Sequence, residues 1–162
     1  VEYELGGDDD AKAEVVMVFL SLPTEIDTTA IVLRAWQDRK RVLAPKVTWD
    51  QRRMLPIEIV SLQGLAKSPY GIREPVEGQP FPIEDIDLVI VPGLGFDERG
   101  HRLGRGRGFY DNFLGQELFK GVACAMAFED QLVEQVPNEP KDVPVDLLVT
   151  DVAVRRFERG KA

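Results

Sequence analysis

The stretch Asp87-Leu-Val-Ile-Val-Pro-Gly-Leu-Gly-Phe-Asp97, continued by Glu98-Arg-Gly-His-Arg-Leu-Gly-Arg-Gly-Arg-Gly-Phe-Tyr-Asp111, decides how this chain folds. The apolar run at 88–91 predicts a short strand that is buried in a parallel sheet. The chain then enters a loop that holds six of its 14 glycines, and it returns to helical periodicity at Phe109. A strand, a glycine-rich loop and a helix in this order predict an α/β fold.

The rest of the chain repeats this alternation of strand and helix. Thr28 suits the cap of a helix whose apolar positions lie at 31–36, and the basic run at 39–41 would complement the helix dipole. The strands on either side of that helix are expected to be parallel. The whole pattern predicts a three-layer helix–sheet–helix architecture around a mostly parallel sheet. The predicted elements are strands at 15–20, 41–47, 54–60 (an edge strand because of Pro56), 88–91, from 122, 145–150 and 152–157, helices at 109–119 and 130–135, and an irregular connection with a short helical turn at 61–82.

Composition narrows the class of protein. The chain has 162 residues, of which 44% are hydrophobic and 30% charged, as is ordinary for one globular domain. Its net charge of −8 disfavours general binding to nucleic acid or to membrane surfaces. No stretch approaches the ~20 apolar residues of a membrane helix, and the acidic start is unlike a signal peptide, so we expect a cytoplasmic protein. The single cysteine, Cys124, excludes an internal disulfide and is predicted to be a buried, inert thiol rather than a nucleophile.

Positive charge is concentrated in the glycine-rich loop. Between Arg99 and Arg107 the chain has four arginines, one histidine and no acid. Guanidinium groups bind phosphate oxygens in pairs of hydrogen bonds, glycines let the backbone approach a ligand, and a helix N-terminus attracts anions. The loop matches neither the P-loop pattern nor the dinucleotide-binding fingerprint, which needs glycine where Glu98 stands. The pattern favours a phosphate site over a flexible solvated loop or an RNA-contacting segment.

Four carboxylates stand where they could serve the same site. Asp111 directly follows the loop and could hold a magnesium ion that rides on nucleotide phosphates, or it could cap the next helix. Asp142 and Asp146 could join Asp111, because ligands gather at the carboxyl ends of parallel strands, or they could be turn residues. Glu25 follows the first strand and opens onto the same edge, where it either recognises amide or amino donors or stays in water.

Several ordered blocks of this chain, taken together, resemble the 5-formyltetrahydrofolate cyclo-ligase (5,10-methenyltetrahydrofolate synthetase) family. The most specific is Pro92-Gly-Leu-Gly-Phe-Asp97 followed by Gly100-His-Arg-Leu-Gly-Arg-Gly-Arg-Gly-Phe-Tyr-Asp111. The similarity extends from about Val15 to Thr150. The other matching blocks are Phe19-Leu-Ser21 with Glu25, Gly71-Ile-Arg-Glu-Pro75, Met126-Ala-Phe128, Gln135-Val-Pro137 and Asp142-Val-Pro-Val-Asp146.

The resemblance implies an enzyme with the NagB/RpiA/CoA-transferase type of fold. Its reaction would be ATP + 5-formyltetrahydrofolate → 5,10-methenyltetrahydrofolate + ADP + phosphate, with Mg²⁺ as the cofactor. The formyl oxygen attacks the γ-phosphate, N10 closes the ring and phosphate leaves, so the protein positions groups and neutralises charge. The alternative is a relative that binds folate or nucleotide without turnover. The expected partners are these two small molecules, with no nucleic acid and no membrane, and we expect a monomer.

The same resemblance implies roles for individual residues. Arg105, Arg107 and Tyr110 would be catalytic, and Asp111 and Asp142 would hold the magnesium. ATP would be bound by Arg102, Leu103, Gly104, Arg105, Gly106, Arg107, Gly108, Phe109 and Tyr110. The folate would be bound by Leu20, Glu25 (a hydrogen-bond partner of the pterin ring), Tyr70, Arg105, Gly106, Arg107, Gly108 and Phe109.

Three features depart from the family pattern. Phe109 stands where many relatives have tyrosine, and Lys141 stands where a histidine is frequent. Family members also begin with a helix whose basic residues reach the ATP phosphates, whereas Lys12 is the single basic residue of 1–14. Either the chain has lost its natural start, or the protein binds nucleotide differently or poorly. On the first alternative we divide the chain into an acidic N-terminal segment, 1–14, as the remnant of a truncated start, and a single α/β cyclo-ligase-like domain, 15–162.

Overall fold

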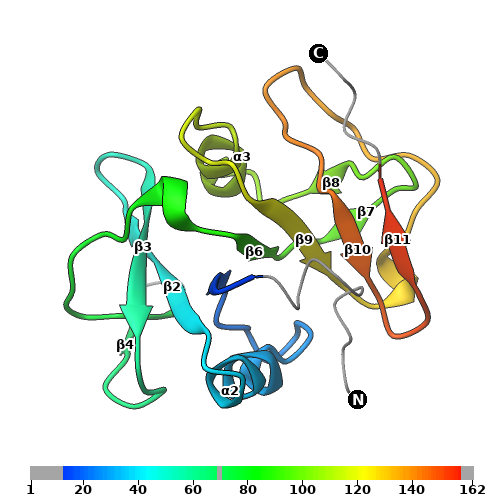
Figure 1. Ribbon diagram of the computed structural model, residues 1–162. Helices are drawn as coiled ribbons and strands as arrows, with labels where there is room; N and C mark the ends of the chain where they lie inside the picture. Colours follow the sequence, from blue (N-terminus) through cyan, green and yellow to red (C-terminus); the bar gives the residue numbers. More distant parts are fainter. Residues whose placement is uncertain (1–12, 69–70, 158–162) are drawn as a thin grey trace.

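The protein is built on one seven-stranded sheet, seen in a computed structural model that describes residues 13–68 and 71–157 (Figure 1). The strand order is β11-β10-β9-β6-β1-β2-β3, so the predicted strand of the opening stretch, β6, lies near the middle. The α/β class predicted from the sequence is confirmed. The strands of this sheet are β1 (Val15–Val18), β2 (Arg41–Thr48), β3 (Arg53–Ile59), β6 (Leu88–Val91), β9 (Val122–Met126), β10 (Leu147–Val149) and β11 (Val154–Arg156).

The five inner strands are parallel and the two edge strands are antiparallel. β1 pairs in parallel with β2 and β6, and β9 pairs in parallel with β6 and β10. β3 runs antiparallel to β2, and β11 runs antiparallel to β10. Pro56 lies in β3, opposite Pro45, which confirms the prediction of an edge strand since proline cannot donate to a further neighbour.

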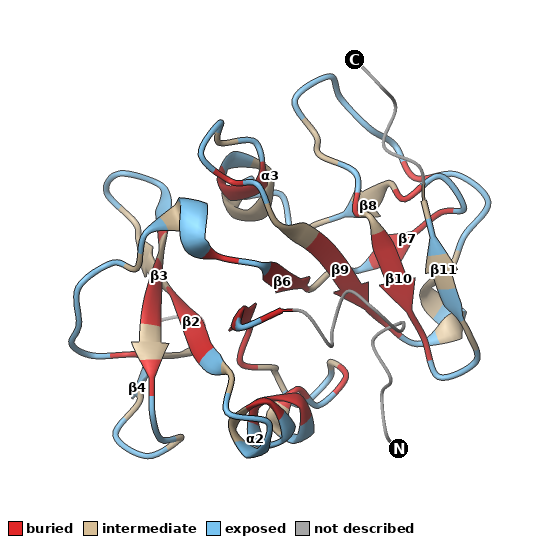
Figure 2. Ribbon diagram, in the orientation of Figure 1, coloured by how far each residue is buried: buried red, intermediate tan, exposed pale blue. Residues whose placement is uncertain are grey.

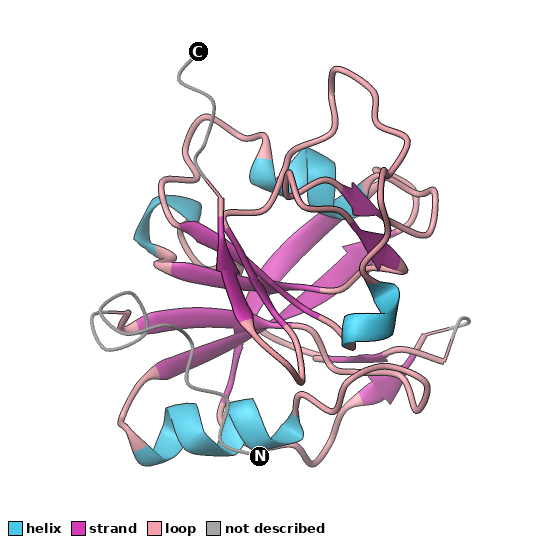
Figure 3. Ribbon diagram, turned by 90° about the vertical axis from the view of Figure 1, so that its right-hand side faces the viewer, coloured by secondary structure: helices cyan, strands magenta, loops and turns pink. Residues whose placement is uncertain are grey.

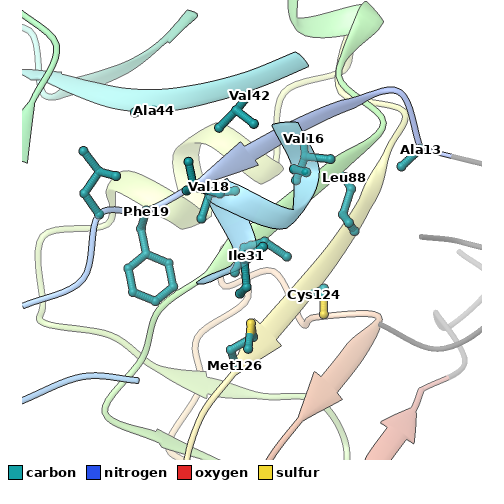
Figure 4. Packing of buried hydrophobic residues seen from close by; sticks show 14 of the residues in the cluster. Ala13, Val16, Val18, Phe19, Ile31, Val42, Ala44, Leu88, Cys124 and Met126 are labelled. Carbon is teal, nitrogen blue, oxygen red and sulfur yellow. The ribbon is translucent and has the colours of Figure 1, made fainter. Parts of the chain in front are cut away.

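Both faces of the sheet are covered, which explains why the inner strands are uninterrupted apolar runs. In β1, Val16 and Val18 belong to the core that includes Ile31 of helix α2 (Thr29–Gln37) (Figure 4). The alternate residue Met17 belongs to a second core, together with Phe113 of helix α3 (Phe109–Leu114). The buried strands lie between the two helices in Figure 2, and the view turned by 90° in Figure 3 shows helices on both sides of the strands.

Helix α3 is shorter than predicted. The spacing of apolar residues indicates a helix over 109–119, but α3 ends at Leu114 and Gly115 is its C-cap. Glycine is a poor helix former, and beyond it the chain closes two tight turns in which Gln116 and Phe119 donate to carbonyls three residues back. Leu118, predicted on the apolar face, is 58% exposed, whereas Phe119 is buried.

Helix α2 begins where predicted but is held differently. Thr28 occupies the N-cap position, yet its hydroxyl donates to the carbonyl of Phe19 at 2.6 Å rather than accepting from the helix backbone. The basic run 39–41 lies beyond the helix, because Arg39 has a φ of 60° and turns the chain. Lys40 then donates to the carbonyl of Ala13, and Arg41 pairs with Glu58. The prediction that these two residues complement the dipole of α2 is therefore wrong.

Two small antiparallel pairs and two 3-10 turns complete the described part of the chain. β4 (Ala66–Lys67) pairs with β5 (Arg73–Glu74) inside the connection predicted to be irregular, and the helical turn expected there comes later, as η1 (Ile83–Asp85). β7 (Gly95–Phe96) pairs with β8 (Arg102–Leu103) inside the glycine-rich loop. The helix predicted at 130–135 is reduced to η2 (Glu129–Gln131). In the described ranges, no helix is both long and apolar enough to cross a membrane.

Candidate active site

A cleft lies outside the carboxyl ends of β1 and β6. The chain leaves β1 through α2 toward β2 on one side, and it leaves β6 through α3 toward β9 on the other. Neighbouring parallel strands whose connections diverge leave a crevice between them. The cleft encloses ≈ 890 Å³, which is within the ~300–1,000 Å³ typical of small-molecule sites. Its lining includes Phe19, Leu20, Glu25, Val47, Trp49, Arg52, Met54, Ile72, Glu74, Pro92, Gly93, the whole run 102–112, Asn138, Lys141 and Asp142.

The glycine-rich loop is anchored to the body of the protein by Asp97, which is 1% exposed. One carboxylate oxygen accepts the backbone N–H groups of Arg99 (2.9 Å) and His101 (3.1 Å). The other accepts the N–H of Val136 (3.0 Å) and lies 3.1 Å from His101 Nδ1. Burial alone would raise the pKa of Asp97, but these hydrogen bonds to the ionised form outweigh it and leave the pKa below its ordinary value. Asp97 therefore ties the connection between β7 and β8 to Val136.

Arg102 forms part of the cleft wall, with a side chain only 6% exposed. Its guanidinium donates to the carbonyl of Pro92 at 3.1 Å and lies 3.6 Å from Asp111 Oδ1. It also lies over the ring of Tyr110, 5.5 Å from the centroid. Its Nε is buried and has no hydrogen-bond partner among the described residues. This arginine is therefore held in place by the fold and is not a mobile surface charge.

Two glycines make room for Arg102. A Cβ added to Gly93 would lie 2.9 Å from the Arg102 side chain, and one added to Gly104 would lie 2.8 Å from its Nη1. Both distances are shorter than real Cβ contacts. Glycine at these two positions therefore lets the loop pack closely around the buried Arg102 side chain.

Arg105 and Arg107 are exposed at the mouth of the same cleft. The guanidinium of Arg107 lies 5.4 Å from the ring centroid of Trp49, and that ring meets Phe109 edge-on at 5.4 Å. The aromatic pair gives the mouth a firm wall on the β2–β3 side, because Trp49 lies in the turn between those strands. Two cations thus face the cleft, and an aromatic ring supports the guanidinium of Arg107.

The loop enters α3 through two glycines with left-handed backbone. Gly106 has a φ of 85° and Gly108 a φ of 72°, conformations that L-residues with side chains rarely adopt. No side chain caps the helix, so the first N–H groups of α3 are open toward the cleft that residues 109–111 line. Backbone N–H groups and guanidinium groups therefore converge, which is an arrangement that binds anions.

Asp111 and Asp142 line the cleft beside the loop. Asp111 Oδ1 accepts the N–H of Val143 at 3.1 Å, so it does not cap its own helix. Asp142 Oδ2 accepts the N–H of Glu139 at 2.8 Å. Asp146, the third candidate, accepts the N–H of Ala123 at 2.8 Å and serves the sheet.

The donor set of Asp111 and Asp142 fits Mg²⁺. In each carboxylate the second oxygen, Asp111 Oδ2 or Asp142 Oδ1, accepts no hydrogen bond from a described residue. Within the described ranges, no three histidine, cysteine, aspartate or glutamate side chains gather to hold a metal. Mg²⁺ commonly takes only one or two carboxylates and completes its shell with water and substrate phosphates, so the two oxygens suffice for an ion that arrives with a nucleotide.

Glu25 and Leu20 lie on the opposite wall, after β1. Glu25 is half-buried, and its Oε1 accepts the N–H of Leu22 at 2.7 Å, which directs the carboxylate. The Thr28 hydroxyl, by donating to Phe19, ties the start of α2 to the end of β1 and so holds this loop in place. Leu20 is 3% exposed and offers an apolar surface.

Tyr110 connects the two walls. Burial raises the pKa of its hydroxyl well above the ordinary value, the charge of Arg102 opposes the shift, and the charge of Glu25 adds to it. The hydroxyl is therefore protonated at neutral pH and can act as a hydrogen-bond donor. The phenol is therefore close enough to both Arg102 and Glu25 for their charges to act on it.

The structure gathers most of the predicted site residues and adds others. All of the run from Arg102 to Tyr110 lines the one cleft, together with Leu20, Glu25, Asp111 and Asp142. Tyr70 lies outside the described residues. Sequence reasoning missed Trp49, Arg52 and Glu74, which line the cleft from the β2–β3 turn and from β5. Glu74 could have been found because it lies in the block 71–75 that resembles the family. Trp49 could have been found because a lone tryptophan in a polar turn is unusual.

Comparisons with known proteins agree with this geometry. A family profile described as the 5-formyltetrahydrofolate cyclo-ligase family matches residues 8–151. The 5-formyltetrahydrofolate cyclo-ligase of Mus musculus is 31% identical over 142 residues, which cover 81% of this chain and 70% of the mouse protein. The enzyme of that name from Escherichia coli (strain K12) is 34% identical, with 85% and 78% covered. The solution structure of Aquifex aeolicus 5,10-methenyltetrahydrofolate synthetase superposes with a TM-score of 0.79 at 33% identity, covering 97% of this chain and 78% of that one.

Proposed function

Because this chain belongs to the 5-formyltetrahydrofolate cyclo-ligase family, we propose that it is an ATP-dependent ligase that converts 5-formyltetrahydrofolate to 5,10-methenyltetrahydrofolate, with release of ADP and phosphate. One observation carries the proposal beyond family membership: the arginine–glycine loop and Glu25 form opposite walls of one cleft at the switch point of the sheet. A single cleft with an anion-binding wall and a carboxylate wall suits two different small molecules that react with each other.

The proposed reaction needs no nucleophile from the protein. The formyl oxygen attacks the γ-phosphorus, the bond to the β-phosphate oxygen breaks, and ADP leaves. N10 then attacks the activated formyl carbon, loses its proton, and phosphate departs to leave the methenyl bridge. Phosphorylation turns a poor leaving oxygen into a good one, so the protein contributes positioning and stabilisation of charge.

The loop residues divide these tasks according to their exposure. Arg105 and Arg107, exposed at the mouth, are proposed to neutralise the transferring phosphoryl group. The buried Arg102 positions Asp111 and Tyr110 from behind. Tyr110, whose raised pKa keeps its hydroxyl protonated, is proposed to donate a hydrogen bond to the oxygen that becomes charged. The backbone of the loop binds the remaining ATP phosphates, through Leu103, Gly104, Gly106, Gly108 and Phe109.

Asp111 and Asp142 are proposed to hold the Mg²⁺ that accompanies ATP. The ion would offset the charge of the phosphates while they react. Asp111 is oriented for this by Val143 and Arg102, and Asp142 by the backbone of Glu139. Residues 1–12 of the acidic segment 1–14, which does not resemble the basic N-terminal helix of the family, lie outside the described residues.

The opposite wall is proposed to bind the folate. Glu25 would accept hydrogen bonds from the pterin ring, Leu20 would pack against it, and Tyr70 would stack on it. Residues 105–109 would contact both substrates. We further propose that the helix–sheet–helix layers are of the NagB/RpiA/CoA-transferase type, which the placement of α2 and α3 on opposite faces supports. The division at residue 14, a monomeric state and a cytoplasmic location stay predictions.

The test is a spectroscopic assay. The protein is mixed with 5-formyltetrahydrofolate, Mg²⁺ and ATP, and the absorbance of the methenyl product is followed. We expect product that depends on ATP, with one ADP released per methenyl group formed. An absence of product above an ATP-free control, combined with intact folate binding, would favour the alternative of a relative that binds without turnover.

A further inference from the structure

Glu74 stands in the cleft as a carboxylate without a known task. It belongs to β5, which lies against β2 and brings Ile72 and Glu74 into the lining next to Val47. The surroundings are mostly apolar, with Met54 of β3 on the same wall. The folate is proposed to bind in this same cleft, so the inference below rests on the proposed function.

One oxygen of Glu74 is left unsatisfied by the fold. Oε1 is buried and has no hydrogen-bond partner among the described residues. The nearest cation does not pair with it, because the Lys46 ammonium donates to the carbonyl of Val76 at 2.9 Å. Burial raises the pKa of Glu74, against the opposing effects of the Val47 backbone amide and the charge of Lys46. A buried acceptor in this state is unfavourable and calls for a partner that is absent from the protein alone.

We propose that Glu74 is a specificity-determining residue that accepts hydrogen bonds from the N–H groups of the folate ring. The ring of a reduced pterin carries an amino group and ring N–H groups, which need acceptors, and its carbon atoms can pack against the apolar side chains around Glu74. Glu25 already accepts the Leu22 N–H with one of its two oxygens, so Glu74 supplies the further acceptor that a ring with several donors needs. The last torsion of a glutamate side chain has a broad minimum, so the buried oxygen can turn to face a ring in the cleft.

This role predicts discrimination as well as affinity. A site built to receive donors rejects an analogue that lacks them, because the acceptor then stays buried and unpaired. The apolar contacts of Val47 and Met54 cannot make that distinction. Glu74 would therefore select a donor-bearing ring over a flat aromatic ring of the same size.

The experiment measures dissociation constants for 5-formyltetrahydrofolate and for ATP by equilibrium dialysis. It uses the wild type, Glu74→Gln, Glu74→Met and the control Glu77→Gln, which removes a charge from an exposed residue outside the lining. We expect at least tenfold weaker folate binding for both Glu74 variants, unchanged ATP binding, and no effect of Glu77→Gln. The melting temperature of ligand-free Glu74→Gln should be close to that of the wild type, because the amide oxygen can still accept the Val47 backbone N–H.

Each outcome of this experiment leads to a different conclusion about Glu74. Unchanged folate affinity in Glu74→Met would overturn the inference and leave the proposed function intact. A lower melting temperature together with lower affinity for both ligands would show a structural role instead, and would also overturn it. If the wild type bound no 5-formyltetrahydrofolate, the proposed function itself would fail, and this inference with it.

Discussion

At the residue scale, position separates arginines that the sequence presents as equivalent. Arg102 is 6% exposed and lies against Tyr110 and Asp111, whereas Arg105 is exposed at the mouth of the cleft. A buried guanidinium that is removed leaves its partners unpaired and harms folding. An exposed one that acts only on a ligand can be removed at little cost to stability, so the two arginines must be tested differently.

Replacing Arg105 with alanine should therefore reduce turnover and spare the fold. Loss of one preorganised charge at a reacting group lowers kcat by roughly 100-fold or more. The measurement is methenyl formation under saturating substrates, with the melting temperature recorded alongside. Arg99→Ala is the matched control, because Arg99 is an exposed arginine of the same loop outside the cleft lining, and it should keep nearly full activity. Equal losses in both variants would contradict the assigned role.

Asp97 gives the stability of the protein a dependence on pH. Its folded-state pKa lies below the ordinary 3.8, so its contribution is fully present above that value and is lost as the pH falls through the folded-state pKa. Asp97→Asn should lower the free energy of unfolding at pH 7 by about 2 kcal/mol, since hydrogen bonds to a buried charge are lost. Urea denaturation at pH 7 and below pH 4 checks this: the gap between wild type and variant should narrow at the lower pH. A gap that stayed constant would mean that the Asp97 charge does not matter.

At the element scale, the glycine-rich loop is fixed where its turns meet the body of the protein. Gly100 accepts the N–H of Val145 at 2.9 Å and so ties the β7–β8 pair to the start of β10. It has a φ of 83°, and a Cβ there would lie 2.8 Å from the carbonyl oxygen of the same valine. The Val145 backbone and the Phe157 ring, 3.0 Å away, leave little room for relaxation, so glycine is needed here both for its φ and for the lack of space.

Comparing Gly100→Ala with Gly64→Ala separates the cost of the positive φ from the cost of the close contact. Gly64 has a φ of 76° but nothing within 4 Å of an added Cβ. Both variants should lose about 1 kcal/mol because a non-glycine residue is forced to positive φ. Gly100→Ala should lose about 1–3 kcal/mol more from overpacking. Chemical denaturation measures both, and similar losses would show that the loop can shift away from Val145.

The boundaries of elements show where sequence reasoning succeeds and fails. β1, β6 and β9 were predictable, because a strand covered on both faces is a run of apolar residues. The end of α3 was not, since Leu118 continues the helical spacing after Gly115 has ended the helix. The pairs β4–β5 and β7–β8 are two residues long on each strand, which is too short to show any periodicity.

At the scale of the whole molecule, the topology of the sheet creates the site. β1 and β6 are neighbours, although 69 residues lie between Val18, where β1 ends, and Leu88, where β6 begins. Their diverging connections bring the Glu25 loop and the arginine loop to one cleft. Ligands that bridge the two walls should therefore stabilise the entire fold.

This arrangement predicts a pattern of thermal shifts. A ligand present at 100 times its dissociation constant adds about 2.7 kcal/mol to the free energy of unfolding. ATP with Mg²⁺ and 5-formyltetrahydrofolate should each raise the melting temperature. Addition of EDTA should remove most of the ATP-induced shift and leave the folate-induced shift unchanged, because Asp111 and Asp142 are proposed to hold the ion that accompanies ATP. Differential scanning fluorimetry gives the comparison.

Asp111→Asn provides the matched variant for that experiment. It should lose the difference between ATP with and without Mg²⁺, and it should keep the folate-induced shift. Asp130→Asn, an exposed aspartate outside the cleft lining, is the control and should behave as the wild type. A normal response to Mg²⁺ in Asp111→Asn would show that the metal is held elsewhere.

The sequence by itself determined the alternation of strands and helices, the edge position of the Pro56 strand, and the family, because apolar periodicity and ordered motifs are properties of neighbouring residues. Only the tertiary structure decided that the Arg102 side chain is buried against Asp111, that Trp49 supports Arg107, and that an oxygen of Glu74 has no partner within 13–68 and 71–157. The physical reason is that the burial and the hydrogen bonds of a polar atom depend on segments that are distant in the chain. A motif shows which chemical groups are available, and the fold determines which of them are left for a ligand.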